Sequence, residues 1–307
     1  MHRHSLSVGI FAIGLLAGLT AAQAAIATWV SGTGSDIGSC TITAPCRTFA
    51  FAHDQTNNNG SINVLSSGNF GPLTITKPIS IVAQGVEAVI NTATAADGGS
   101  AILVQAGGGA SVSLRGLTID LRGTDNFGIS FVSGAALHVQ DCVIRKTKNG
   151  IFFRPSGASE LTVADSVISN SSGGGIFVFP SGSGHAKLAL DRIRVENNKF
   201  SGILLSAGGS AAIEAAVNDS IVAGNVERGI AAFGGTTEVT INGSAAVDND
   251  TGIFSQNSAI VRIGDSTVTG NATGLAVAGN GVIASYRTNK INGNGTDGAP
   301  TSTISMK

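Results

Sequence analysis

Short runs in which apolar and polar residues alternate recur from about residue 100 to the end of the chain. Each run is only three to five residues long, as in the stretches 137–139, 161–163, 239–241 and 261–263. Alternation with a period of two is typical of β-strands, and this region has no helical period of useful length. The pattern therefore predicts many short strands, each with one apolar side.

A Gly followed by Ile or Leu recurs seven times among these runs and defines a repeat of 22–27 residues. The glycines are Gly128, Gly150, Gly175, Gly202, Gly229, Gly252 and Gly274. A second column has Asn three to five residues before the later glycines, and a third has Asp before Ser or Cys. Their members are Asn170, Asn198, Asn225, Asn249 and Asn271, and Asp141, Asp165, Asp219 and Asp265. Three short strands per repeat of this length describe one coil of a β-solenoid.

Each column of the repeat has an expected role. Coils stack at the strand spacing of about 4.8 Å, so the Ile after each Gly forms an inward ladder. The Asn side chains are expected to hydrogen-bond from coil to coil. Each Gly before Ile is expected to adopt a positive φ where the chain bends into the next strand. The Asp side chains are expected to bond local backbone in turns rather than to bind metal or catalyse a reaction.

The beginning of the chain departs from the repeat. Residues 47–56 can form a short amphipathic helix with Phe49, Ala52 and His53 near one face. A solenoid exposes unpaired strand edges at its ends, so we expect this helix to cap the N-terminal end. His53 is then a cap or surface residue rather than a catalyst, because no orienting partner is evident.

Residues 1–24 have the organisation of a secretory signal peptide. Arg3 supplies a basic start, residues 8–19 form an apolar run, and residues 22–24 read Ala-Gln-Ala, a cleavage site. Spanning a membrane needs about 20 apolar residues, so a signal peptide is favoured over an anchor. We expect an exported protein, periplasmic or extracellular, with no transmembrane anchor after cleavage.

Three cysteines follow this segment. Cys40 and Cys46 are close in sequence and lie in a chain expected to be exported, so a small-loop disulfide is favoured. A metal site is the alternative, although no second Cys/His pair nearby would complete four ligands. Cys142 lies in the repeat and is expected to be a small buried hydrophobe.

Composition narrows the class of protein further. The chain of 307 residues has 43 Gly, 12% charged and 42% apolar residues. Disordered chains combine low hydrophobicity with high charge, so disorder is disfavoured. The net charge of −1 disfavours nucleic-acid binding, which goes with a basic excess.

The order of motifs resembles a known superfamily. The stretch PCRTFAFA at 45–52 is followed by INVLSSGNFGPLTITKPISI at 62–81 and then by the Asn/Gly-Ile coils. This resembles the exported parallel β-helix proteins of the pectin-lyase-like superfamily, and in particular a proteobacterial group of secreted members. The resemblance implies an all-β, single-stranded, right-handed parallel β-helix of about ten coils with a short N-terminal capping helix. Its activity stays open, because the superfamily contains lyases, hydrolases, epimerases, tailspikes and adhesins.

We treat the mature chain as one continuous domain. Residues 25–100 are expected to form the cap and the first coils, and residues 101–307 the regular coils and the C-terminal end.

The strands that end before the Asp turns form the face on which enzymes of this superfamily usually act. Alternation is expected to place six side chains outward on successive coils. They are His138, Thr162, Ala189, Glu214, Thr240 and Arg262. The charged members lie about 10–14 Å apart at the stacking distance, which is too far for a pair of catalytic carboxylates. The superfamily's clustered Asp with Gly-His-Gly has no counterpart here, and we expect no metal or cofactor.

The remaining candidates lie on the coils between residues 141 and 201. This stretch has eight basic and five acidic residues, a net charge of +3 that favours an acidic polysaccharide or cell-surface glycan. The weak catalytic candidates are Arg154, Glu160, His185 and Lys187, which would serve a polysaccharide lyase or glycoside hydrolase. The ligand-binding candidates are Phe152, Arg154, Phe177 and Phe179, whose rings alternate with inward residues.

The loops at 155–160 and 180–186 are expected to fold over these rings, because sugar-binding platforms usually use the polar-edged rings of Trp and Tyr; the binding surface is the alternative. Three functions therefore stay open, and the first is expected most. They are non-catalytic binding of a glycan or surface at the cell envelope, a polysaccharide lyase or hydrolase, and a structural or adhesive surface protein.

Overall fold

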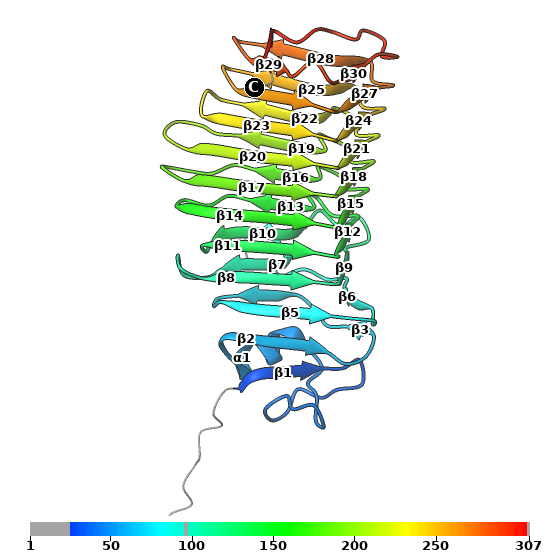
Figure 1. Ribbon diagram of the computed structural model, residues 1–307. Coiled ribbons are helices and arrows are strands. Elements are labelled where there is room, and N and C mark those ends of the chain that lie inside the picture. The colour runs from blue at the N-terminus through cyan, green and yellow to red at the C-terminus, as the bar shows by residue number, and fades with distance from the viewer. Residues whose placement is uncertain (1–24, 95–97, 306–307) are drawn as a thin grey trace, which may run out of the picture.

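The computed structural model describes residues 25–94 and 98–305 and forms a parallel β-solenoid of about 9 turns. The chain winds from β1 and α1 at one end to β28, β29 and β30 at the other (Figure 1). Strands from successive coils pair in parallel and build three sheets of 12, 9 and 10 strands. The predicted fold class is thus confirmed, while the predicted signal peptide lies outside the described residues.

We name the three sheets A, B and C. Sheet A contains β1 (Ala25–Val30), β2 (Thr56–Val64), β5 (Ile79–Ala83), β8 (Ser111–Arg115), β11 (Ala136–Gln140), β14 (Ala158–Ala164), β17 (His185–Asp191), β20 (Ala212–Asn218), β23 (Thr237–Asn242), β26 (Ile260–Gly264), β29 (Val282–Ser285) and β31 (Ser302–Thr303). Sheet B contains β3 (Gly68–Asn69), β6 (Ala88–Ile90), β9 (Leu117–Asp120), β12 (Val143–Arg145), β15 (Val167–Ser169), β18 (Arg194–Glu196), β21 (Ile221–Ala223), β24 (Ala245–Val247), β27 (Thr267–Thr269) and β30 (Lys290–Ile291). Sheet C contains β4 (Leu73–Ile75), β7 (Ser100–Gln105), β10 (Phe127–Ser133), β13 (Ile151–Phe153), β16 (Ile176–Val178), β19 (Ile203–Ser206), β22 (Arg228–Phe233), β25 (Thr251–Gln256) and β28 (Thr273–Ala278).

The core consists of inward ladders in which like residues stack from coil to coil. In sheet C the ladder joins the residue after each repeat glycine, and each member is at most 4% exposed. Its members are Ile129, Ile151, Ile176, Ile203, Ile230, Ile253 and Leu275. Full burial of such side chains stabilises the fold by about 1.5–3 kcal/mol each. The predicted inward phase is confirmed.

The repeat glycines act by close approach, so the expectation of a positive φ was wrong. None of the seven has a positive φ. A Cβ added at Gly128 or any of the next five would lie 2.4–2.9 Å from the carbonyl oxygen of the following coil's glycine. At Gly175 and Gly202 it would also meet Val195 Cγ1 and Val222 Cγ1, at 2.2 and 2.5 Å. Only glycine allows the coils to stack this closely here.

The asparagine column forms a buried hydrogen-bonded ladder, as expected, but with different ends. Each of Asn198, Asn225, Asn249 and Asn271 donates its side-chain amide to Oδ1 of the next member, over 2.8–3.1 Å. Each backbone N–H donates to the same oxygen over 2.9–3.2 Å. Asn294 continues the ladder, which ends on the carboxylate of Asp297. These two hydrogen bonds from Asn294 hold the pKa of Asp297 below its ordinary value.

Asn170 was wrongly placed in this ladder. It is an exposed residue with φ of 57°, and Ser171 occupies the ladder position, where its N–H donates to Asn198 Oδ1 over 3.0 Å. Asparagine tolerates the left-handed conformation of the turn position and also forms the hydrogen bonds of the ladder position. The residue type alone therefore could not tell the two positions apart.

The aspartate column occupies turns between sheets A and B. Asp141, Asp165, Asp219 and Asp265 all have a φ between 47° and 53°. In three of these turns the aspartate is followed by a serine, whose hydroxyl accepts a hydrogen bond from a backbone N–H of the preceding coil. The serines are Ser166, Ser220 and Ser266, and the donor to Ser166 is Cys142, over 3.0 Å. The carboxylate of Asp165 also accepts two bonds from Arg192, which lower its pKa. The expected turn role fits this arrangement.

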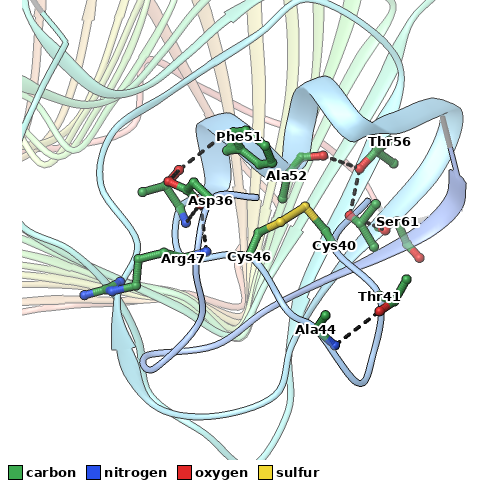
Figure 2. Close-up of a disulfide and its surroundings, with 12 residues drawn as sticks. Asp36, Cys40, Thr41, Ala44, Cys46, Arg47, Phe51, Ala52, Thr56 and Ser61 are labelled. Atoms are coloured by element: carbon green, nitrogen blue, oxygen red, sulfur yellow. Dashed lines mark hydrogen bonds between the residues drawn. A yellow bond between two sulfur atoms is a disulfide. The ribbon is translucent and has the colours of Figure 1, made fainter. Parts of the chain in front are cut away.

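The N-terminal end carries the expected cap. Helix α1 (Phe49–Gln55) begins after Thr48, whose hydroxyl accepts the Phe51 N–H, and it buries Phe49, Ala52 and His53. Cys40 and Cys46 form the disulfide shown in Figure 2, and Cys142 is free and buried. Backbone bonds link both bridged cysteines to Trp29 of β1, so the disulfide loop covers the outer edge of the first strand.

Candidate functional site

Five phenylalanine rings form a continuous row along the outer side of sheet C. In spatial order they are Phe127, Phe152, Phe179, Phe177 and Phe200, and successive ring centroids lie 4.9–6.0 Å apart. Phe152 and Phe177 are register partners on β13 and β16. The residues on either side of each, such as Ile151 and Val178, are fully buried, so alternation turns these rings outward. We call this set the phenylalanine row.

Two cations lie against the phenylalanine row. The Arg154 guanidinium is 5.5 Å from the centre of the Phe152 ring, and Lys148 Nζ is 5.7 Å from that of Phe127. These are cation–π distances. Lys148 also pairs with the exposed carboxylate of Asp125 over 3.2 Å. The row therefore presents apolar faces and positive charge together.

The rings of the phenylalanine row are half-buried, and Phe200 is 40% exposed. The loops expected to cover them are short, because β14 begins at Ala158 and β17 at His185. Part of each predicted loop is thus strand in sheet A. The rings therefore stay partly accessible to solvent.

A second candidate lies on the outer side of sheet A. Glu160, Lys187 and Glu214 are register partners on the adjacent strands β14, β17 and β20. All three line one shallow depression, together with small side chains such as Ala189 and Ala216. Glu160 and Lys187 also line a second, adjoining depression with His185. We call this the charged groove. Its carboxylates and ammonium group stand one coil apart, at about 4.8 Å per coil.

His185 borders the charged groove. Its Nε2 lies 3.4 Å from Oε1 of Glu214, which is ion-pair distance for a protonated imidazole, but the two atoms lack hydrogen-bond geometry. Nε2 is buried without a hydrogen-bond partner, although the side chain is 35% exposed.

The structure thus brings together three of the four catalytic candidates: Glu160, His185 and Lys187. Arg154 belongs instead to the phenylalanine row, with Phe152, Phe177 and Phe179.

Glu214 was assigned to the wrong outward ladder. Ala216, not Glu214, is the register partner of Ala189 and Thr240. Glu214 faces outward two residues earlier, beside Lys187 on one side and Glu238 on the other. Counting three residues back from the turn residue Asp219 selects Ala216. Counting five residues back from Arg192, Asp219 and Gly243 would have grouped Glu214 with its true neighbours, Lys187 and Glu238.

Within 25–94 and 98–305, no group of three or more His, Cys, Asp or Glu side chains could share a metal ion. Among the helices of the same ranges, none is long and apolar enough to cross a membrane.

The three-sheet winding and its outward faces define a parallel β-helix protein. The chain matches the family described as "Right handed beta helix region" over residues 25–214, and it belongs to that family. A solved structure, "Crystal structure of pectate lyase Pel9A", is similar with a TM-score of 0.52 and 15% identity, over 87% of this chain and 70% of that chain. At this identity the likeness shows a pectin-lyase-like fold alone. Comparison with curated proteins gives no match.

Proposed function

We propose that this is an exported protein of the cell envelope or medium that binds an acidic polysaccharide on the phenylalanine row without acting on it chemically. The observation that carries the proposal is the joint placement of five rings with Lys148 and Arg154 on one solenoid face. Outward apolar patches of this kind mark ligand or partner sites. Cations among them favour an anionic ligand.

The structural neighbour supports the choice of ligand class. It is named as a lyase of pectate, an anionic polysaccharide. Sugar rings present apolar C–H faces that can pack on an aromatic ring, while their carboxylates can accept hydrogen bonds from Arg154. Charge-assisted bonds of this kind contribute about 1.5–3 kcal/mol each.

A polysaccharide lyase or hydrolase is the second candidate, and the charged groove favours it. Lys187 lies in register between two carboxylates, with His185 at one end. Proton transfer needs such groups within hydrogen-bond distance of the substrate, directly or through one water. A structural or adhesive role is the third reading and requires no soluble ligand.

A glycan screen combined with product assays separates these functions. We expect binding of anionic glycans, with no new reducing ends and no unsaturated products. Arg154→Ala should weaken binding about tenfold or more, and added salt should weaken it further, because exposed charges are screened over about 8 Å. Product formation that is lost in Lys187→Gln would instead establish the enzyme. Absence of binding to every glycan would leave the structural role.

A further inference from the structure

The chain beyond β30 folds back over the last coil of the solenoid. Residues 294–304 run from the end of the asparagine ladder to β31, along the outer edges of β28 and β29 (Figure 1). β28 is the terminal strand of sheet C. An edge of this kind presents unpaired N–H and C=O groups unless another segment covers it. We call residues 294–304 the strap.

The strap satisfies backbone groups of the last coil that would otherwise face solvent. The N–H groups of Gly274 and Leu275 donate to the carbonyl oxygens of Thr296 and Asp297, over 2.7 and 3.0 Å. The last part of the strap, β31, pairs in parallel with β29. The strap therefore occupies the place that a further coil of the solenoid would take.

Two features hold the strap against β28. The carboxylate of Asp297 accepts the backbone and side-chain N–H groups of Asn294, over 3.0 and 2.9 Å. Gly298 has a φ of 69°, and a Cβ at this position would clash with the Leu275 carbonyl oxygen. Glycine thus lets the strap lie this close to the strand.

Little apolar packing supports these contacts. No residue of the strap, which lies wholly in the described range 98–305, is buried. The residues to which it is bonded belong to the core, since Leu275 is 4% exposed and Ile283 is 0% exposed. Segments with few buried contacts open at a lower free energy than the core does. The strap can therefore lift while the coils beneath it stay folded.

β28 itself has none of the features that keep an exposed edge from pairing with another chain. Its sequence, Thr-Gly-Leu-Ala-Val-Ala, contains no charged residue and no proline. Val277, which follows the part bonded to the strap, is 42% exposed. Protection of this edge thus depends on the strap.

We propose that the strap is an autoinhibitory element: when it lifts, the outer edge of β28 pairs with the same edge of a second copy of this chain. Two identical edges related by a two-fold axis run antiparallel and can exchange backbone hydrogen bonds. The disulfide loop occupies the edge of β1 with its own backbone bonds, so the N-terminal end is blocked. Pairing therefore joins two copies at their C-terminal ends and stops at a dimer. It does not depend on the ligand proposed above.

Gly298→Ala tests the proposal by lifting the strap, because the new Cβ would clash with the Leu275 carbonyl oxygen. Gly182→Ala is the matched control: Gly182 also has a positive φ, of 61°, but a Cβ there meets nothing within 4 Å. Asp297→Ala is a second way to lift the strap, since it removes both hydrogen bonds from Asn294 without a clash.

Hydrogen exchange of the strap in dilute solution measures opening, and sedimentation velocity over a range of protein concentrations measures association. We expect Gly298→Ala and Asp297→Ala to exchange faster than the wild type and to form dimers with a dissociation constant about tenfold lower or less. Gly182→Ala should match the wild type in both measurements. Adding Val277→Lys to Gly298→Ala should keep the fast exchange and weaken the dimer about tenfold, because a charge on the edge opposes pairing.

Any of three results would overturn the proposal. A strap that exchanges fast in a protein that stays monomeric would show that the freed edge does not pair with a second copy. Unchanged exchange in both Gly298→Ala and Asp297→Ala would show that these residues do not hold the strap. A dimer that Val277→Lys leaves unaffected would place the interface elsewhere on the solenoid. Circular dichroism should verify that each variant keeps its strands.

Discussion

Individual polar residues inside this solenoid satisfy backbone and side-chain groups of the neighbouring coil. Asn249 is the clearest case, because its Oδ1 accepts from both the backbone and the side chain of Asn225 while its amide donates to Asn271. A buried polar group that loses its partner costs about 1–3 kcal/mol. The ladder therefore stabilises the fold only while it is continuous.

We expect Asn249→Leu to lower the free energy of unfolding by about 2–4 kcal/mol, since it leaves two donors of Asn225 and the Oδ1 of Asn271 without this partner. The matched control is Asn170→Gly, at an exposed position with positive φ, which should change stability by less than about 1 kcal/mol. Urea denaturation measures both. Equal effects of the two substitutions would contradict the ladder assignment.

Cys142 is expected to be unreactive in the folded protein. It is 2% exposed, and burial raises the pKa of its thiol to about 11, so little thiolate forms at neutral pH. Intact-mass measurement after alkylation should count no modified thiol in the native protein, one after denaturation and three after denaturation with reduction. Three modified thiols before reduction would show that Cys40 and Cys46 are not bonded.

At the scale of the secondary-structure elements, the repeat glycine at the start of seven of the sheet C strands sets how closely two coils approach. Gly202→Ala should destabilise the protein by about 1–3 kcal/mol, because the new Cβ would lie 2.5 Å from Val222 Cγ1 and 2.9 Å from the Gly229 carbonyl oxygen. Gly208→Ala is the control, since a Cβ there meets nothing within 4 Å. Thermal unfolding should show the first variant alone to be strongly destabilised. A tolerated Gly202→Ala would refute the close-approach argument.

The capping helix is expected to weaken in acid through His53. Burial is the main cause that lowers the pKa of His53, Asp54 raises it, and Lys77 lowers it again. The native state therefore binds fewer protons than the unfolded state below about pH 6.5, and stability falls as the pH falls through that value. In the neutral ring, Nε2 accepts a hydrogen bond from the Thr76 N–H over 3.4 Å. Protonation of Nε2 would remove this acceptor and break the bond.

Hydrogen exchange of α1 and β1 measures this effect. We expect protection of both elements to decrease between pH 7 and pH 5, and the decrease to be smaller in His53→Gln, which has no titrating imidazole. Identical pH dependence in the two proteins would show that another group controls the cap.

The repeat allowed most of these elements to be predicted from sequence, because a 22–27-residue period fixes coil, core ladder and turn at once. The prediction failed where the turn column and the ladder column both accept asparagine. Asn170 was therefore placed in the ladder, although Ser171 occupies that position. It also failed where register had to be counted over coils of unequal length, as for Glu214. Local patterns specify neither the register between coils nor the directions of side chains. The neighbours of Glu214 depend on that register, and the contacts that Phe127 and Phe200 make within the phenylalanine row depend on both.

At the scale of the whole molecule, the stacking of short coils converts residues far apart in the sequence into continuous axial stripes. Sheet C carries the phenylalanine row, and sheet A carries the charged groove. The two ends differ. Helix α1 lies at the N-terminal end (Figure 1), where the disulfide loop also bonds to β1. At the C-terminal end the two-residue strands β30 and β31 pair with β27 and β29. The solenoid thus presents two distinct faces on which a polymer could lie.

Calorimetric titration of pectate oligomers against Phe177→Ala and Lys187→Gln distinguishes a ligand bound on sheet C from one bound on sheet A. Phe177 belongs to the phenylalanine row, whereas Lys187 is the cation of the charged groove. Loss of one half-buried ring contact of about 1.4 kcal/mol corresponds to tenfold weaker binding. We expect that loss in Phe177→Ala and less than a twofold change in Lys187→Gln. Tenfold weakening in Lys187→Gln with unchanged affinity in Phe177→Ala would rule out binding on sheet C and place the ligand in the charged groove.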